Sequence, residues 1–214
     1  MWSQEILNSL EKSKIVAVVV LDREQDAVFT ARALVRGGIT HMEPTLRTEE
    51  APAALQAIVR EVPEMTVGAG TVLTTDQVNL VKQIGAQFAV APGFNPAVVA
   101  AAEAVGLPFA PGVATPSEIE GAYGRGCTVL KLFPATPLGG PSYLKSVNAA
   151  YRHLRLRFIP TGGVTENTMV DWLSVPEVLA VGGSWLAPAD LIHAGDWDEI
   201  ERRATSAVDR IAAG

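Results

Sequence analysis

Residues 128–134 read Thr-Val-Leu-Lys-Leu-Phe-Pro, a short apolar run with a lysine, Lys131, at its centre. Gly126 before the run and Pro134 at its end bound it, so the run predicts a buried strand. A lysine is costly there, because a buried ammonium without a partner is poorly solvated and tends to shed its proton. The neutral amine is a nucleophile that can form a Schiff base with a carbonyl. The ordinary alternative is a lysine at a strand end whose amine reaches water or a carboxylate.

Similar apolar runs recur along the chain, and helical patterns separate them. The eight runs expected as strands are residues 15–20, 39–46, 65–72, 87–92, 108–113, 128–134, 157–164 and 178–185. The segments expected as helices are residues 26–35, 49–61, 75–84 (capped by Thr75), 96–105, 116–123, 141–151, 166–173 and 197–212. Eight strand–helix units in 214 residues predict one α/β domain over residues 1–214, a single (β/α)8 or TIM barrel. A doubly wound open sheet is the competing arrangement.

Composition excludes several classes of protein. A net charge of −6 argues against nucleic acid or an anionic membrane as the main partner. No apolar run is long enough to span a bilayer, and the first residues do not resemble a signal peptide. The single cysteine, Cys127, predicts a reducing, cytoplasmic location and a buried, inert thiol. His41, His153 and His193 show no metal-ligand spacing, so neither a metal nor another cofactor is expected.

Five of the expected strands end in small residues on their carboxyl side. These endings are residues 68–70, 91–93, 110–112, 161–163 and 182–184. Active sites of barrels lie at the face where the carboxyl ends of the strands gather, and small residues there leave room for a ligand. The last two endings close the seventh and eighth runs, which predicts a phosphate site built from backbone N–H groups. The alternative is that the glycines and prolines at these strand ends only form ordinary loops.

The second run carries a carboxylate, Glu43, on the same face as Thr45. A carboxylate inside a barrel needs a partner or a reaction, so two interpretations stay open. One is a salt bridge to Arg47 or Lys131, and the other is a general acid/base beside a reactive carbonyl. Arg47 can bind a carboxylate or phosphate in a bidentate manner. The alternative is that its side chain is only solvated. Thr71 follows Gly70 at the end of the third run and can donate its hydroxyl to the same anion.

Seven short motifs follow one another in order over nearly the whole chain. They are Glu-Pro-Thr-Leu-Arg-Thr (43–48), Val-Gly-Ala-Gly-Thr-Val (67–72), Ala-Pro-Gly (91–93), Pro-Gly-Val-Ala-Thr (111–115), Lys-Leu-Phe-Pro (131–134), Pro-Thr-Gly-Gly-Val (160–164) and Gly-Gly-Ser-Trp-Leu (182–186). With these motifs the chain resembles the 2-keto-3-deoxy-6-phosphogluconate (KDPG) aldolase family, some members of which also cleave 4-hydroxy-2-oxoglutarate (KHG). The resemblance implies a (β/α)8 barrel that forms homotrimers and works without a metal. It also implies a lyase, a class I pyruvate aldolase of carbohydrate metabolism in the Entner-Doudoroff pathway.

The resemblance implies a role for each site residue. Lys131 would form the Schiff base, and Glu43 would shuttle protons. Arg47 and Thr71 would hold the carboxylate of pyruvate. The remaining expected substrate contacts are Phe133 beside the imine, Thr161 at the hydroxyls, and Gly162, Gly163 and Ser184 at the phosphate.

The expected reaction is cleavage of KDPG to pyruvate and glyceraldehyde 3-phosphate, with cleavage of KHG to pyruvate and glyoxylate as a second activity. The galactonate epimer of KDPG fits the motifs equally well. Two further alternatives are a phosphate-binding barrel isomerase or epimerase, and a non-enzymatic protein that binds a small sugar phosphate. An isomerase or epimerase would leave Lys131 without a role. A binding protein would gain little from two buried titratable groups such as Glu43 and Lys131.

Two positions depart from the family pattern. Pro44 stands where the family usually has an aliphatic residue, and proline removes a donor from a strand ladder. A bulge or bend beside Glu43 is therefore expected. Residues 15–20 lack the proline and the basic residue that the first strand of the family often carries. Contacts from the loop after this strand to the sugar end of the substrate therefore stay open.

Overall fold

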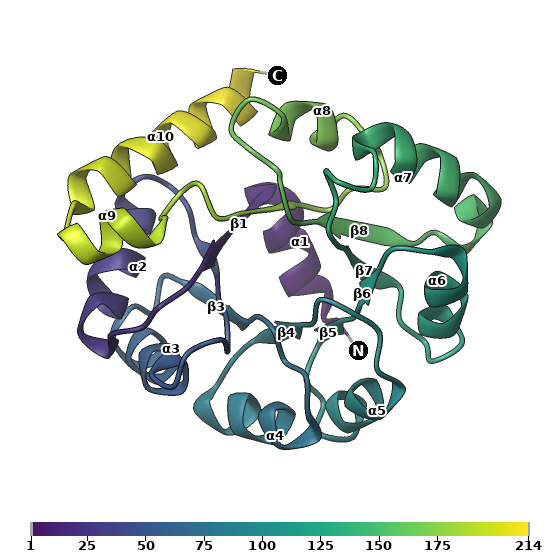
Figure 1. Ribbon diagram of the computed structural model, residues 1–214, viewed down its shortest axis with the longest axis horizontal. Helices are drawn as coiled ribbons and strands as arrows, with labels where there is room; N and C mark the ends of the chain where they lie inside the picture. Colours follow the sequence, from purple (N-terminus) through teal and green to yellow (C-terminus); the bar gives the residue numbers. More distant parts are fainter. Residues whose placement is uncertain (1, 214) are drawn as a thin grey trace.

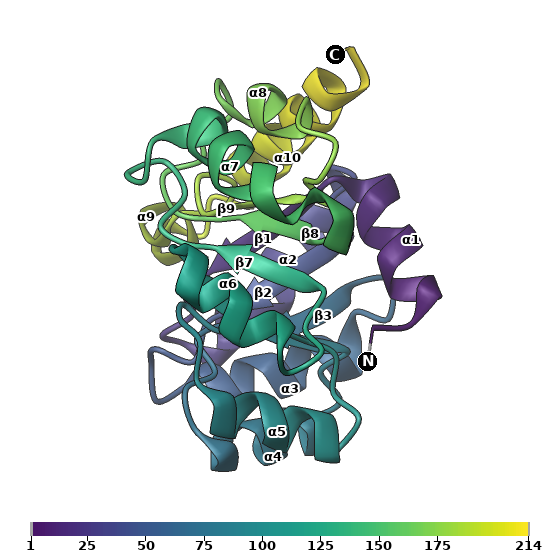
Figure 2. The same cartoon turned by 90° about the vertical axis from the view of Figure 1, so that its right-hand side faces the viewer.

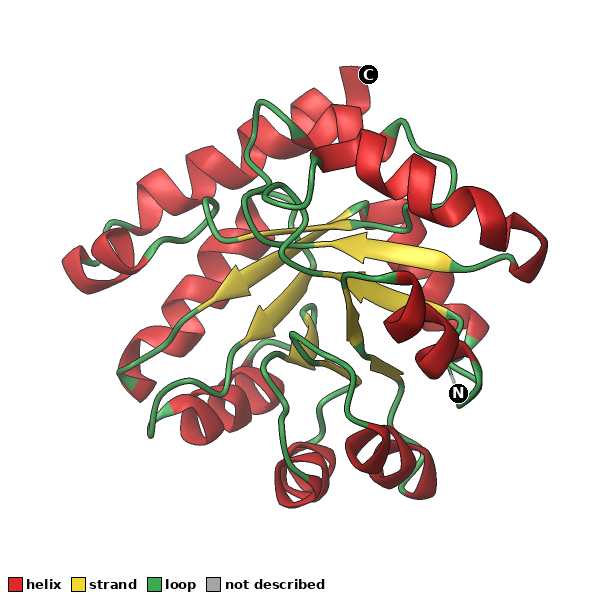
Figure 3. Cartoon of the chain, turned by 45° about the vertical axis from the view of Figure 1, so that its right-hand side comes forward, coloured by secondary structure: helices red, strands yellow, loops and turns green. Residues whose placement is uncertain are grey.

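Parallel strands alternate with helices along the chain in the computed structural model, which describes residues 2–213, and the helices surround the strands (Figure 1 and Figure 3). The strands are β1 (Ile15–Val19), β2 (His41–Pro44), β3 (Thr66–Ala69), β4 (Phe88–Val90), β5 (Phe109–Ala110), β6 (Gly112–Val113), β7 (Val129–Leu132), β8 (Arg157–Pro160) and β9 (Val181–Gly183). The α-helices are α1 (Gln4–Ser13), α2 (Ala27–Arg36), α3 (Ala51–Glu61), α4 (Thr75–Ile84), α5 (Pro96–Ala104), α6 (Pro116–Tyr123), α7 (Gly140–Asn148), α8 (Met169–Leu173), α9 (Ala189–Ala194) and α10 (Trp197–Ala213). Two 3-10 helices are η1 (Glu24–Asp26) and η2 (Ala149–Leu154).

The strands form a curled six-stranded parallel sheet in the order β5-β4-β3-β2-β1-β9, and a three-stranded parallel sheet in the order β6-β7-β8. Every expected apolar run contains a strand, but the run over residues 108–113 contains two. Pro111 separates β5, which pairs with β4, from β6, which pairs with β7. Isolated bridges between Thr161 and Gly182 and between Phe158 and Val178 connect the two sheets on the other side.

Two apolar clusters make up the core. The larger one packs side chains of the strands against the outer helices. The smaller one joins residues from strands of both sheets, including Val16 of β1, Phe88 of β4, Val129 of β7 and Ile159 of β8, so the strands enclose it. Side chains on a strand repeat every second residue, so Val129 shares a face with Lys131. The small cluster therefore lies one layer beneath the lysine, towards the amino-terminal ends of the strands.

Helix α1 covers the amino-terminal ends of the strands (Figure 2). Its Leu10 belongs to the inner cluster, and the Ser9 hydroxyl lies 3.0 Å from Nε2 of His41 at the start of β2. Lys14, which caps the helix, accepts the N–H of Val181 at the start of β9. The sequence reasoning did not identify α1, although Ser3 caps it through the backbone N–H of Ile6. The helix stabilises the closed end of the molecule and leaves the carboxyl ends of the strands open.

Several expected boundaries shift. Thr74, not Thr75, is the N-cap of α4, because its hydroxyl accepts the N–H of Gln77 while the Gln77 side chain accepts the Thr74 N–H. Helix α8 begins at Met169, three residues later than expected, and the short α9 was not expected at all. Local patterns place helix ends only to within a few residues.

The bulge or bend expected at Pro44 does not occur. Pro44 is the last residue of β2, pairs in register with Val19, and accepts the N–H of Gly70 through its carbonyl oxygen. The ladder then continues, because Thr45 donates its N–H to Val19. A proline is tolerated at this strand end, and Glu43 keeps the inward direction that strand alternation assigns to it.

Within residues 2–213, no helix combines the length and the apolar character needed to cross a membrane, and no three His, Cys, Asp or Glu side chains gather to hold a metal. Cys127 is half-buried, whereas the sequence analysis expected it to be buried. Burial, and to a smaller extent the charge of Glu103, raise the pKa of its thiol to about 11. A thiol that stays protonated is a poor nucleophile, which agrees with an inert Cys127.

Candidate active site

A cavity of about 300 Å³ opens at the carboxyl ends of the strands. All nine residues expected at the site line it, from five separate segments of the chain: Glu43, Arg47, Thr71, Lys131, Phe133, Thr161, Gly162, Gly163 and Ser184. Parallel strands place their carboxyl ends at one face, which is why residues so far apart in sequence meet there. The structure thus brings the whole expected set together.

Lys131 and Glu43 form a buried ion pair at the floor of this cavity. Nζ of Lys131 donates to Oε1 of Glu43 at 2.8 Å, and the two residues are 4% and 2% exposed. Of the two partners left open for Glu43, the structure selects Lys131. The carboxylate stabilises the buried ammonium and is also placed to accept its proton. Nζ also lies 5.8 Å from the centroid of the Phe133 ring.

Gly70 makes room for Glu43. A Cβ atom at position 70 would lie 2.3 Å from Oε1 of Glu43 and 2.8 Å from its Cγ, which is closer than nonbonded atoms approach. The missing side chain on β3's carboxyl side therefore lets the glutamate reach Lys131. The small residue at this strand end thus makes room for a side chain of the protein, whereas the sequence analysis expected it to make room for a ligand.

Arg47 and Thr71 line the same cavity as the ion pair. Arg47 is exposed, and its Nε donates to Oγ1 of Thr45 at 3.2 Å. Thr71 has a φ of 59°, a left-handed conformation that is rare for a β-branched residue. Such outliers concentrate at functional sites because the surrounding structure must hold them. The guanidinium and the threonine hydroxyl are groups that bind a carboxylate.

Gly162, Gly163 and Ser184 lie at the more open part of the cavity. Both glycines have positive φ angles, 93° and 81°, so the chain turns here in a way that residues with a Cβ rarely adopt. Gly163 and Ser184 are exposed. Backbone N–H groups in such left-handed turns form concave anion sites. The arrangement suits the phosphate end of a ligand.

Five further residues line the cavity that the sequence reasoning did not include in the site: Val18, Thr45, Pro92, Val164 and Gly182. Strand alternation already placed Thr45 on the face of Glu43, and that signal was enough to find it. Val18 is two residues from Val16 of the inner cluster, so the same alternation identifies it. These residues add mainly apolar surface around the ion pair.

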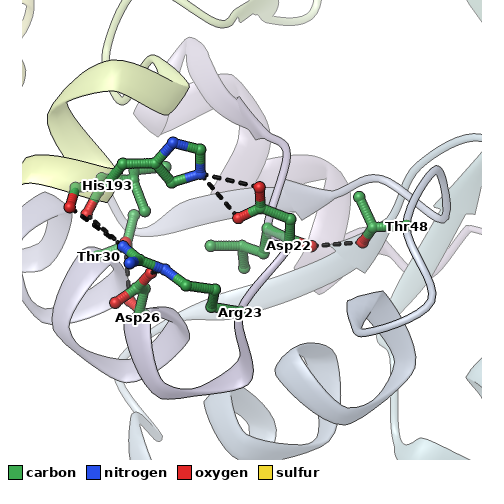
Figure 4. Close-up of polar contacts among 8 residues, drawn as sticks. Asp22, Arg23, Asp26, Thr30, Thr48 and His193 are labelled. Carbon is green, nitrogen blue, oxygen red and sulfur yellow. Dashed lines mark hydrogen bonds and ion pairs between the residues drawn. The ribbon is translucent and has the colours of Figure 1, made fainter.

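The loop after β1 is tied to its neighbours by polar contacts (Figure 4). The Asp22 carboxylate lies 2.8 Å from Nε2 of His193, and this hydrogen bond lowers the pKa of Asp22. Arg23 pairs with Asp26 at 2.5 Å and also donates to the carbonyl oxygens of Ile192 and His193. The loop is thereby fixed to the end of α9, and Val18 is the nearest residue before it that lines the cavity.

Comparisons with known proteins identify the family of this chain. The family described as "Aldolase: KDPG and KHG aldolase" matches residues 6–203. The chain is 45% identical over 195 residues to the 2-dehydro-3-deoxy-phosphogluconate aldolase of Treponema pallidum, covering 91% of this chain and 92% of that protein. It is 41% identical over 208 residues to the KHG/KDPG aldolase of Escherichia coli, covering 97% of each.

A solved structure gives the same result. The KDPG aldolase of Legionella pneumophila, in which pyruvate was captured at low pH as a covalent carbinolamine intermediate, superposes with a TM-score of 0.90 at 34% identity. The match covers 96% of this chain and 99% of that one. Over nearly its whole length, then, this chain belongs to the KDPG and KHG aldolase family.

Proposed function

We propose that this chain is a class I aldolase that cleaves KDPG to pyruvate and glyceraldehyde 3-phosphate through a Schiff base on Lys131. The observation that carries the proposal is the buried contact of 2.8 Å between Lys131 and Glu43 at the floor of a cavity of about 300 Å³. A nucleophile beside its own proton acceptor is the arrangement that imine chemistry needs. The relatives that share this fold are named as aldolases of the same substrate.

Imine formation begins when the Lys131 ammonium transfers a proton to Glu43. The neutral amine attacks the C2 ketone of the substrate, and a carbinolamine forms. Glu43 returns its proton to the carbinolamine hydroxyl, which leaves as water, and the resulting iminium ion draws electrons from the neighbouring carbon atoms. Arg47 and Thr71 hold the carboxylate at C1 during these steps, and Phe133 packs beside the imine.

Carbon–carbon cleavage follows from the same geometry. Glu43, directly or through a water molecule, removes the proton of the C4 hydroxyl. The C3–C4 bond breaks, its electron pair moves into the iminium, and glyceraldehyde 3-phosphate leaves. Glu43 returns a proton to C3 of the enamine, and hydrolysis releases pyruvate and frees Lys131.

The distal end of the substrate contacts the other side of the cavity. Thr161, which is buried, contacts the hydroxyls, while Gly162, Gly163 and Ser184 bind the phosphate through backbone N–H groups and one side-chain hydroxyl. The succession from a buried ion pair to exposed residues supports this orientation, since a phosphate dianion is costly to bury.

Sodium borohydride reduction with pyruvate tests the proposal. We expect an irreversible adduct on Lys131, located by mass spectrometry of proteolytic peptides, and loss of activity in proportion to the adduct. No adduct, or an adduct on another lysine such as the exposed Lys82, would overturn the proposal. EDTA should leave cleavage unchanged, because no step uses a metal.

Substrate preference is tested by the relative kcat/KM for KDPG, its galactonate epimer and KHG. We expect KDPG to be preferred, because the exposed glycine turn with Ser184 supplies phosphate contacts that KHG cannot use. A higher kcat/KM for KHG than for KDPG would assign the principal role to the unphosphorylated substrate. KHG cleavage to pyruvate and glyoxylate is proposed as the lesser activity.

The architecture and assembly form part of the proposal. We infer that the two sheets make one closed (β/α)8 barrel and that residues 1–214 are one domain. The bridge between Thr161 and Gly182, and the direct continuation of β5 into β6 across Pro111, support a closed barrel. A homotrimer follows from the family resemblance, and light scattering should give three times the mass of the chain. We also propose a cytoplasmic location, which the single cysteine supports.

A further inference from the structure

The segment Thr45–Thr48, which carries Arg47, is anchored to the β1 chain at both of its ends. We propose that Thr45 is a positioning residue for substrate binding, which acts by holding the Arg47 guanidinium in the orientation that grips the carboxylate of the pyruvate moiety. This inference rests on the proposed function, because it takes Arg47 as the carboxylate ligand.

Thr45 is itself held firmly. It is 3% exposed, its N–H donates to the carbonyl oxygen of Val19 at 2.9 Å, and its Oγ1 donates to the same oxygen at 3.3 Å. Thr45 also forms a parallel bridge to Gly70, so strands on both sides fix it. A side chain with this many contacts is a rigid reference point.

Arg47 is tied to Thr45 twice. Its backbone N–H donates to the Thr45 carbonyl oxygen at 2.8 Å, and its Nε donates to Thr45 Oγ1 at 3.2 Å. The Thr45 hydroxyl therefore makes two hydrogen bonds: it donates to the carbonyl oxygen of Val19 and accepts from Nε of Arg47. A threonine hydroxyl can do both at once, and a methyl group can do neither.

The other end of the segment is fixed by Thr48. Its hydroxyl donates to the carbonyl oxygen of Leu21, and Figure 4 shows this bond beside Asp22. The exposed Arg47 thus stands between two threonines that are both bonded to the chain of β1 and its loop. Thr45 and Thr48 together fix the backbone of residues 45–48, but of the two only Thr45 holds the guanidinium group of Arg47.

The bond through Nε leaves the two Nη groups of Arg47 unused by Thr45. A guanidinium is planar, so holding Nε orients the remaining donors as a fork that matches a carboxylate. An exposed arginine without this bond samples many rotamers and must be ordered again whenever substrate binds. The expected consequence of losing the hydroxyl is weaker binding of the carboxylate with little change in the chemistry at Lys131.

The variants Thr45→Val and Thr45→Ser form a matched pair. Valine keeps the shape and removes the hydroxyl, whereas serine keeps the hydroxyl. We expect Thr45→Val to raise KM for KDPG about tenfold, the effect of about one hydrogen bond to a charged group, with kcat nearly unchanged. Thr45→Ser should restore KM close to that of the unaltered chain. A fall in kcat with KM unchanged, or equal effects of valine and serine, would overturn the proposal.

A background of Arg47→Ala separates positioning from direct contact. If Thr45 acts through Arg47, adding Thr45→Val to Arg47→Ala should change KM less than about twofold, because the partner is already gone. A full tenfold effect in that background would mean that Thr45 touches the substrate itself, and the proposal would be wrong. Thermal unfolding of each variant checks that the fold is kept.

Borohydride trapping over a range of pyruvate concentrations separates a failure of the proposed function from a failure of the role of Thr45. The unaltered chain and Thr45→Val should both give the adduct on Lys131, with the variant needing about ten times more pyruvate for half-trapping. An unaltered chain that gives no adduct refutes the proposed function. An adduct whose pyruvate dependence is the same in both proteins refutes only the role of Thr45.

Discussion

Nζ of Lys131 and Oε1 of Glu43 lie 2.8 Å apart although the two residues are 88 positions apart in the chain. One comes from β7 of the three-stranded sheet and the other from β2 of the six-stranded sheet. Their contact crosses the interior between the sheets and sits directly above the apolar cluster around Val129. The pair therefore joins the two sheets as well as placing a proton acceptor beside a nucleophile.

Glu43→Gln should separate imine formation from carbon–carbon cleavage. Glutamine keeps the size of the side chain but cannot accept the C4 hydroxyl proton, so kcat for KDPG should fall about 10²–10⁴-fold, the usual worth of a general base. Borohydride should still trap pyruvate on Lys131, although more slowly, because water must then accept the Lys131 proton in place of Glu43. The exposed Glu49→Gln is the control and should keep full activity. A Glu43→Gln enzyme with unchanged kcat would remove Glu43 from the mechanism.

Lys131→Met should destabilise the fold because it leaves the Glu43 carboxylate buried without a partner. The free energy of unfolding in urea at pH 7 should fall by about 3–5 kcal/mol. Replacing both residues, as Lys131→Met with Glu43→Leu, should recover most of this loss, since two apolar side chains need no compensation. Both proteins should be inactive. A double variant no more stable than Lys131→Met would show that the ion pair is not the source of the effect.

Gly70→Ala should damage catalysis by displacing Glu43. The new Cβ would meet Oε1 of Glu43 at 2.3 Å, so the carboxylate must move away from Lys131. We expect kcat for KDPG to fall at least about tenfold, by loss of part of the general-base contribution. Gly93→Ala is the matched control, because a Cβ at position 93 meets nothing within 4 Å. Equal activity of the two variants would contradict the steric argument.

His41 should make stability depend on pH. Burial lowers its pKa from 6.5 to about 4, so between these values the unfolded chain binds a proton that the folded chain does not. Its contribution, about 3 kcal/mol, is fully present above pH 6.5 and is lost as the pH falls to about 4. Urea unfolding from pH 7.5 to 4.5 should show this loss.

His41→Gln should flatten that pH dependence, because glutamine does not titrate. The exposed His153→Gln is the control and should keep the pH dependence of the unaltered chain. If His41→Gln and the unaltered chain lost stability in parallel between pH 6.5 and 4.5, another group would be responsible. The contact of His41 with Ser9 also predicts that α1 is the first element to loosen at low pH.

Much of the site could be predicted from the sequence because the signals are local. Each apolar run contains a strand, and strand alternation assigns Glu43 and Thr45 to one face. The carboxyl ends of parallel strands meet at one edge, so residues after the runs had to gather there. The nine expected residues line one cavity for that reason.

Other features could not be predicted, because they depend on contacts between distant segments. Helix α1 is stabilised by the ends of several strands, and the first residues alone do not show what they will cover. Pro44 looked disruptive because a single sequence does not show that its strand ends there and that its carbonyl is used by Gly70. Pro111 divides one apolar run between two sheets, and only the pairing of its neighbours reveals this.

Three features follow from the sequence: the alternation of strands and helices (apart from α1, α9 and the division between β5 and β6), the inward direction of Glu43, and the family to which the seven motifs point. These depend on the two-residue period of a strand and on the small residues at strand ends. The pairing of Glu43 with Lys131 and the hydrogen bond from Arg47 to Thr45 depend on contacts in the folded protein. Side-chain distances of about 3 Å depend on how far the sheets curl and on the register between strands, and no local pattern in the chain encodes either.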